Sequence, residues 1–197
     1  MIDGRAVLAL VHFNGYVDAD GAYGVQQRGA LVVAPLGHTS DEEADVAARI
    51  LRDATTVVRA DRARDAVLCK MVVNLSGSLQ TLTALHERPS DDESALQNLL
   101  SGMLVEGVQI IRAAGAREVR VPGTPPWIVM QASRVLPPAI TRPIFRRNVR
   151  KMRVSSLAQD VARGLPVGDT ELDVIHGELV RLADTFHVRA PITRTVL

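Results

Sequence analysis

Residues 63–85, ARDAVLCKMVVNLSGSLQTLTAL, form the stretch that decides the fold we expect for this chain. The run is largely apolar, and from Asp65 to Leu85 it is long enough for about five turns of α-helix. Lys70 lies in its middle and Asn74 follows four residues later, so a helix projects both side chains from one face. Two interpretations stay open. Either the lysine methylenes are buried while the ammonium reaches water, or ammonium and amide point together into a cleft, where a lysine can hold an anion or give up a proton.

Composition narrows the class of protein. Of the 197 residues, 47% are hydrophobic and 23% are charged, which is ordinary for a soluble globular protein. The net charge of +1 and the 3% of aromatic residues argue against nucleic acid or an anionic membrane as a partner. Cys69 is the only cysteine, so no internal disulfide is possible and we expect a cytoplasmic protein. Neither a signal peptide nor an apolar run of membrane-spanning length is apparent.

The first sixty residues are predicted to form strands with one helix. Ser40 and Glu43 have the spacing of a capping box, which opens a helix that ends near Arg52. The pattern changes from strand to helix after Ala60, so we expect a segment of residues 1–60 followed by a domain of residues 61–197. Apolar and β-branched runs bounded by turn residues predict the strands, which are residues 5–13, 23–28, 30–37 and 55–59.

The rest of the chain is predicted to be mainly helical. A second capping box at Ser90 opens a long helix, in which Gly102 and Gly107 suggest the close approach of another helix. Pro137 and Pro138 are expected to stop the helix that precedes them. The predicted helices are residues 65–85, 90–115, 127–136, 156–163 and 170–186.

Several residue types that often carry chemistry lack a usable arrangement. The five histidines and Cys69 show no metal-ligand spacing, so no metal site is expected. Asp18 and Asp20 begin like a calcium loop, but the glycine comes too early and the closing glutamate is missing, which favours a turn. The basic segment 142–153 either grips a phosphate or an acidic partner or forms a solvated helix face. No G-x-G-x-x-G or G-x-x-x-x-G-K-[ST] motif occurs.

Short motifs in the second half of the chain follow one another in a definite order. They are K-x-x-x-N at Lys70–Asn74, S-S-x-x-Q-D at 155–160, T-E-L-D at 170–173 with Gly177, and H-V-R-A-P at 187–191. This order resembles the helical domain of the ketopantoate reductase (2-dehydropantoate 2-reductase) family. The resemblance covers nearly the whole chain, because residues 5–59 look like the last strands of that family's nucleotide-binding domain. It implies an α+β fold, with a mainly helical C-terminal domain like that of 6-phosphogluconate dehydrogenase after a small strand-rich remnant of a Rossmann-type domain.

The resemblance also implies an activity and residues that carry it. The family reduces the ketone of ketopantoate, a 2-oxo acid, with NADPH in pantothenate biosynthesis. Lys70 matches the lysine that donates the proton, and an ammonium beside a developing alkoxide both stabilises the charge and supplies the proton. Asn74 and Ser156 match residues that hold the substrate. A second substrate asparagine of the family falls at Ser78, which keeps a hydroxyl and loses the amide.

On the cofactor side the resemblance is less complete. Glu171 matches a glutamate at the cofactor edge of the cleft, and Gly15 falls near the cofactor-contacting backbone. The glycine-rich motif and the first two-thirds of the Rossmann-type domain have no counterpart in these residues. We therefore expect the chain to be incomplete or inactive alone, and to bind NADPH only when the nucleotide-binding half is supplied, for example by a separate chain.

Two functions remain open at this point. One is a ketopantoate-reductase-like oxidoreductase chain that reduces a 2-oxo acid to a 2-hydroxy acid. The other is a non-catalytic helical module of the same origin, kept for homodimerisation or for binding another partner.

Overall fold

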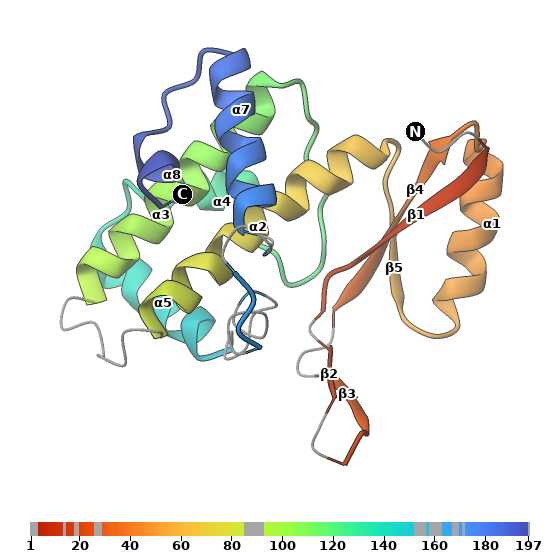
Figure 1. Ribbon diagram of the computed structural model, residues 1–197, viewed down its shortest axis with the longest axis horizontal. Helices are drawn as coiled ribbons and strands as arrows, with labels where there is room; N and C mark the ends of the chain where they lie inside the picture. The colour runs from red at the N-terminus through yellow and green to blue at the C-terminus, as the bar shows by residue number, and fades with distance from the viewer. Residues whose placement is uncertain are drawn as a thin grey trace. The chain divides into compact units, whose positions relative to one another are not determined.

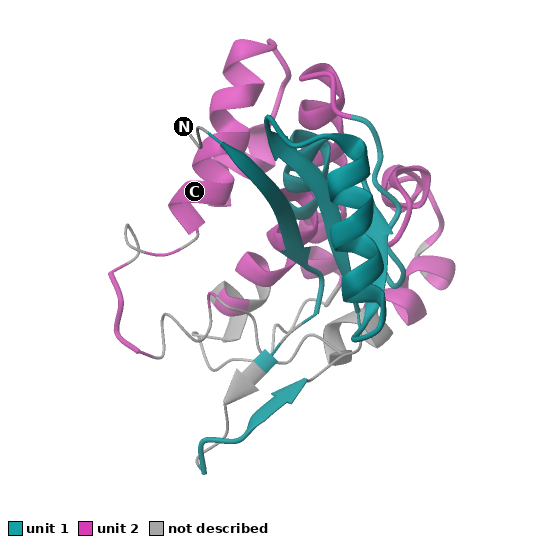
Figure 2. Ribbon diagram, turned by 90° about the vertical axis from the view of Figure 1, so that its right-hand side faces the viewer, with its two compact units in different colours: residues 1–70, 117–124 teal, residues 71–116, 125–197 magenta. Residues whose placement is uncertain are grey.

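The computed structural model describes residues 4–13, 15–17, 20–25, 29–84, 93–151, 157, 163–166, 170 and 172–196. The chain divides into two compact units (Figure 2). Unit 1 is Met1–Lys70 with Arg117–Thr124, and unit 2 is Met71–Ala116 with Pro125–Leu197. These units have other bounds than the predicted domains 1–60 and 61–197, and the division into those two domains stays a prediction.

Unit 1 contains a three-stranded sheet in the order β1-β4-β5 (Figure 1). β1 (Arg5–Val11) pairs antiparallel with β4 (Ala30–Gly37), from Arg5 opposite Gly37 to Val11 opposite Leu31. β5 (Thr56–Arg59) pairs parallel with the other edge of β4. The central strand is almost wholly apolar because both of its faces are covered. These strands lie where the sequence predicted them.

The two faces of β4 are covered by different elements of unit 1. Ala30, Val32 and Ala34 point to a core that includes Ala66 and Val121. Val33 is fully buried on the other face, because side chains alternate along a strand. There α1 (Asp41–Arg52) packs on β4 and β5.

The start of α1 confirms the predicted capping box. The Glu43 N–H donates to Ser40 Oγ at 3.2 Å, and the Ser40 N–H donates to the Glu43 carboxylate at 2.9 Å. Two backbone donors at the helix start are therefore satisfied reciprocally. α1 connects β4 to β5, which pair parallel.

A short hairpin extends the β1–β4 pair (Figure 1). It consists of β2 (Gly15–Val17) and β3 (Tyr23–Val25). β3 confirms the first part of the strand predicted over residues 23–28, whose last three residues lie outside the described part of the chain. At the hairpin base the His12 N–H donates to the Ala30 carbonyl at 2.9 Å. The two chain segments come so close here that a Cβ on Gly29 would lie 2.0 Å from the His12 carbonyl oxygen.

α2 (Ala63–Ala84) is the long apolar helix that the sequence predicted, and it begins in unit 1 and continues in unit 2. At its start Arg62 donates to both carboxylate oxygens of the buried Asp65, at 2.8 and 2.9 Å. This pairing compensates the desolvation of the carboxylate and orients the helix start. Further along, Val72 and Leu75 are buried in unit 2.

Unit 2 is built around α3 (Glu93–Ala113), which packs against most of the helices that follow (Figure 1). Its glycines permit close helix packing, as predicted. A Cβ on Gly107 would lie 3.0 Å from Leu75 Cδ1 of α2, and one on Gly102 would lie 2.2 Å from Ile192 Cδ1. The other described elements are α4 (Trp127–Ala132), α5 (Pro138–Lys151), the π-helix η2 (Asp173–Gly177), α7 (Glu178–Thr185) and α8 (Pro191–Val196).

The structure corrects three expectations about these helices. α4 ends at Ala132, before the predicted end at residue 136, and Pro138 opens α5 where we expected only a helix stop. A proline is tolerated in a first turn because its missing N–H is not needed there. The helix predicted over residues 170–186 is not uniform, since η2 precedes α7. Like Pro138, Pro191 opens a helix, which is α8. Most of the helix predicted over residues 156–163 lies outside the described residues.

A buried carboxylate of α3 holds the start of α8. Glu106 is 4% exposed, and its oxygens accept hydrogen bonds from the Ile192 N–H at 3.1 Å, the Thr193 N–H at 2.8 Å and the Thr193 hydroxyl at 2.8 Å. The first N–H groups of a helix have no partner within it, so this carboxylate supplies one from a neighbouring helix.

His176 of η2 is completely buried in unit 2. Burial lowers its pKa to about 4, and the nearby Thr193 backbone opposes this shift only in part. Neither ring nitrogen has a partner with hydrogen-bond geometry. The imidazole is therefore neutral at pH 7, and the polar group is buried at a cost to folding.

The pH dependence of unfolding should reveal His176. The unfolded histidine takes up a proton below about pH 6.5 while the folded one resists to about pH 4, so stability falls as the pH drops through this window. We expect His176→Leu to be roughly 2 kcal/mol more stable than the wild type at pH 4.5 and close to it at pH 7. Urea unfolding at both pH values measures this. His38→Leu, which changes an exposed histidine, is the control, and equal pH slopes for wild type and His176→Leu would refute the prediction.

The hairpin base should not tolerate a side chain. Gly29→Ala places a methyl group against the His12 backbone, which cannot yield as a side chain would, so we expect a loss of about 2 kcal/mol or more in the free energy of unfolding. Gly15→Ala is the matched control, because the nearest atom to its new methyl is 3.7 Å away. Urea unfolding of the two variants tests the difference. Similar stability of both would contradict the close approach.

Candidate functional site

Lys70 is held at the end of β1 within unit 1. Its ammonium donates to the Val11 carbonyl at 2.6 Å, and the side chain is half-buried. Neighbours on the helix, Leu68 and Cys69, are buried. The position lets the methylenes pack against apolar groups while the ammonium reaches a backbone oxygen. Lys70 is therefore an oriented cation whose direction is set by β1.

His12 follows Val11 and belongs to the same end of β1. Its pKa is lowered to about 4, first by burial and second by the positive charge of Lys70. Its Nε2 is buried and has no hydrogen-bond partner. The imidazole is thus neutral at pH 7.

Sequence reasoning weighed His12 only as a metal ligand and missed its place beside Lys70. The two residues are 58 positions apart, and no spacing rule connects them. A histidine near the end of a predicted apolar strand was the one available signal, because segments that connect strands often carry site residues.

The predicted substrate residues that the structure describes lie on α2. Asn74 follows Lys70 by one helical turn and is half-buried, and Ser78 follows Asn74 by another turn and is buried. Residues four apart project from one helix face. The three residues therefore lie on successive turns of α2, and their roles in a site stay predictions.

The other predicted site residues are less informative. Gly15 is the first residue of β2 and pairs with Val25 in the hairpin. Ser156 and Glu171 lie outside the described residues. Their predicted roles in substrate and cofactor binding therefore stay predictions.

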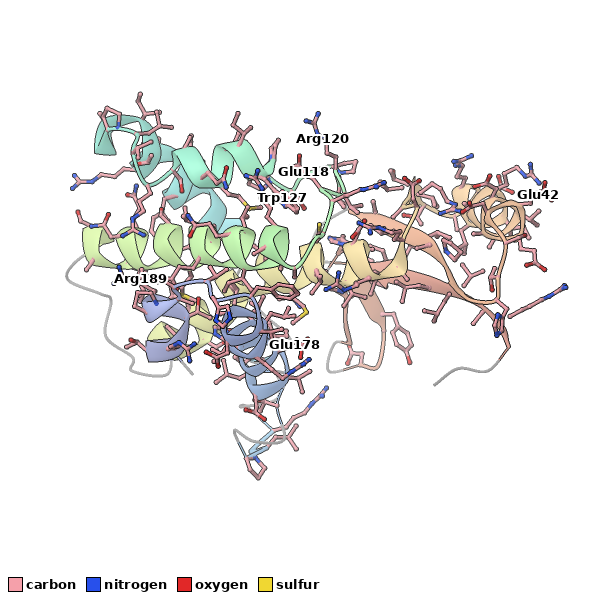
Figure 3. All side chains as sticks on the ribbon, turned by 90° about the horizontal axis from the view of Figure 1, so that it is seen from above. Glu42, Glu118, Arg120, Trp127, Glu178 and Arg189 are labelled. Atoms are coloured by element: carbon pink, nitrogen blue, oxygen red, sulfur yellow. The ribbon has the colours of Figure 1, made fainter. Side chains whose placement is uncertain are left out.

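Cys69, next to Lys70, has a structural environment. The Val119 N–H donates to Cys69 Sγ at 3.4 Å, and the thiol donates to the Arg117 carbonyl at 3.6 Å. Burial is the main cause that raises the pKa of the thiol, so a thiolate nucleophile is disfavoured at pH 7. Nearby, Glu118 and Arg120 form an ion pair at 3.6 Å on the surface of the same segment (Figure 3).

The described residues of unit 1 do not fit the phosphates of a dinucleotide. Such a site uses a glycine-rich turn between a strand and a helix, with the helix N-terminus facing the pyrophosphate. The turn after β4 leads instead into Asp41, Glu42 and Glu43, three carboxylates in the first turn of α1. Their charge repels an anion, so we derive no catalytic step through NADPH from this chain.

Two further findings concern the described residues alone. They contain no group of three or more His, Cys, Asp or Glu side chains placed to hold a metal ion. None of their helices combines the length and the apolar character that crossing a membrane requires.

The chemistry of the site follows from Lys70 and its helix. An ammonium oriented by a carbonyl can attract a carboxylate or donate a proton to an oxygen that gains negative charge. The amide and hydroxyl of Asn74 and Ser78 can hydrogen-bond polar groups in either sense.

Comparison with protein families places this helix in a known context. The model described as ketopantoate reductase PanE/ApbA C terminal matches residues 62–197. Residues from α2 to the end of the chain therefore form the C-terminal domain of an oxidoreductase family. The chain belongs to the ketopantoate reductase family. No curated protein matches it significantly.

Solved structures share the fold over a longer range. A PanE/ApbA family ketopantoate reductase from Ralstonia eutropha JMP134 is 23% identical, with 96% of this chain and 56% of that chain covered at a TM-score of 0.58. A dimeric ketopantoate reductase from Staphylococcus aureus is 16% identical, with 96% of this chain and 58% of that chain covered at a TM-score of 0.66. A D-mandelate dehydrogenase in complex with NADH is 15% identical, with 96% of this chain and 60% of that chain covered at a TM-score of 0.66. The chain thus spans little more than half the length of these proteins.

The expected fold class is confirmed. The structure has a mainly helical C-terminal part after a small strand-rich part, and the family match covers the helical part. The resemblance stated from short motifs is confirmed with it.

Proposed function

We propose that this chain is the substrate-binding and proton-donating part of a ketopantoate-reductase-like oxidoreductase. It would serve the reduction of a 2-oxo acid, such as 2-dehydropantoate, to the 2-hydroxy acid. The observation that carries this proposal is the Lys70 ammonium held at 2.6 Å by the Val11 carbonyl, at the start of the family's C-terminal domain.

Lys70 is the proposed general acid. Reduction of a ketone to a hydroxyl needs a hydride at carbon and a proton at oxygen. The ammonium stabilises the negative charge that grows on the oxygen and then delivers the proton. The half-buried position of Lys70 supports this role, because electrostatic interactions are stronger away from bulk water.

Asn74, Ser78 and Ser156 are the proposed substrate-binding residues. Asn74 and Ser78 share a face of α2 with Lys70, and a 2-oxo acid offers carboxylate and carbonyl oxygens to such groups. A small organic acid is the partner that we propose for this face. Neither a nucleic acid nor a membrane is proposed as a partner.

The cofactor is proposed to be NADPH, bound only when a nucleotide-binding part is supplied from outside these 197 residues. A separate nucleotide-binding chain is one such source. Glu171 and Gly15 are then the proposed contacts of this chain on the cofactor side. We further propose that the protein acts in the cytoplasm, and that it forms a homodimer, which the dimeric relative from Staphylococcus aureus supports.

A second candidate function is a non-catalytic module that mediates dimerisation. The acidic start of α1 supports it, because the described part of unit 1 does not fit a dinucleotide. This alternative predicts a stable oligomer on sizing in solution, and no effect of Lys70 substitutions beyond a small change in stability.

Replacement of Lys70 separates the two functions. We expect Lys70→Met to weaken ketopantoate binding about ten-fold, because a charge-assisted hydrogen bond to the substrate is lost. Where the cofactor part is present, turnover should fall by about a hundred-fold or more, since general acid catalysis is lost as well. Isothermal titration calorimetry measures the binding, and the loss of NADPH absorbance measures the turnover.

Arg64→Met is the matched control, since it removes an exposed cation from the same helix. It should leave ketopantoate affinity unchanged. If the wild-type chain shows neither ketopantoate binding nor turnover with NADPH, the catalytic proposal fails.

A further inference from the structure

The end of β1 fixes the backbone of His12 from two sides. The His12 N–H donates to the Ala30 carbonyl at 2.9 Å. The backbone of Gly29 lies so close that any Cβ there would be 2.0 Å from the His12 oxygen. The preceding carbonyl, that of Val11, accepts the Lys70 ammonium at 2.6 Å. His12 is therefore anchored next to the lysine by main-chain contacts that do not use its side chain.

The His12 imidazole has an unexplained polar atom. Its Nε2 is buried and has no hydrogen-bond partner. Buried polar atoms without a partner are uncommon in folded proteins, because the lost contact with water is not replaced. His12 therefore places a buried polar atom without a partner close to Lys70.

The His12 ring and the Lys70 ammonium act on each other electrostatically. The positive charge of Lys70 adds to burial in lowering the pKa of His12 to about 4. Such coupling is reciprocal, because a charge that disfavours protonation of its neighbour is itself disfavoured by that protonation. At neutral pH the His12 imidazole is therefore uncharged.

Other groups around His12 do not account for this coupling. β4, which pairs with β1, carries no titratable side chain. Cys69, beside Lys70 on α2, is engaged with the Arg117 carbonyl and the Val119 N–H. Lys70 is the charged group that acts on His12.

We propose that His12 is a positioning residue for Lys70, whose neutral imidazole accepts a hydrogen bond from the ammonium when a 2-oxo acid draws it away from the Val11 carbonyl. The part of this proposal in which a 2-oxo acid draws the ammonium away from Val11 rests on the proposed function. A neutral acceptor suits the task, because it keeps the proton on the lysine and adds no charge to the site. In this scheme the Val11 carbonyl holds the ammonium at rest and His12 Nε2 holds it when substrate is bound.

The pair is tested first without any ligand. In the NMR titration of the His12 C2–H resonance, Lys70→Met should raise the pKa of His12 by about half a unit or more, because the repelling charge is removed while burial remains. Arg64→Met, with a cation removed elsewhere on α2, should leave it unchanged. If Lys70→Met leaves the His12 resonance titrating as in the wild type, the pairing of the two residues is wrong.

The positioning role is tested by ketopantoate binding. His12→Leu should weaken the affinity about three- to ten-fold, whereas His12→Gln, which keeps a hydrogen-bond acceptor, should restore it to near the wild-type value. Urea unfolding of the same variants identifies any loss of structure. Equal affinities of the folded His12→Leu and wild-type proteins would overturn the role.

The outcomes also separate this inference from the proposed function. If no variant and no wild-type chain binds ketopantoate, the proposed function fails, and the positioning role fails with it. The NMR comparison of Lys70→Met with Arg64→Met still decides whether His12 and Lys70 form a coupled pair. If the wild type binds ketopantoate but His12→Gln binds it no more tightly than His12→Leu does, only the positioning role is refuted.

Discussion

The ammonium of a lysine in a largely apolar helix needs either water or a hydrogen-bond acceptor, and this constraint applies to Lys70 of α2. The Val11 carbonyl meets it with a hydrogen bond of 2.6 Å to Lys70. This carbonyl lies at the end of β1, next to the hydrogen bond of His12 with Ala30 and the close approach of the Gly29 backbone. The orientation of one cation therefore depends on the sheet, the hairpin base and the helix start of unit 1.

Buried polar groups need hydrogen-bond partners, and in unit 2 Glu106 has such partners whereas the ring of His176 has none. Glu106 is buried and accepts three hydrogen bonds at the start of α8, so its charge supports the fold. His176 is buried close to Thr193 with neither ring nitrogen bonded, so it weakens the fold when it is protonated. His12 shares the low pKa of His176 but stands beside an ordered cation. That neighbour is what makes His12 a candidate for function.

Local signals in the sequence predicted much of the architecture. The capping box at Ser40 predicted α1, the β-branched run at residues 30–37 predicted β4, and the apolar run around Lys70 predicted α2, because each depends on contacts within a few residues. The glycines of α3 indicated close packing for the same reason. The mixed π- and α-helix after Thr170 and the helices opened by Pro138 and Pro191 were not predicted, since packing against other helices decides which turns of a marginal helix persist.

The sequence by itself determined most strands and the long helices, the family, and the spacing that puts Lys70, Asn74 and Ser78 on one face of a helix. Each of these follows from the spacing of residues along one stretch of chain, because the helical period fixes which residues share a face. Only the tertiary structure decided what the Lys70 ammonium bonds and which histidine stands next to it. Val11 and His12 are about sixty residues away in the chain, and the pairing of strands, which no local pattern specifies, brings them to the lysine.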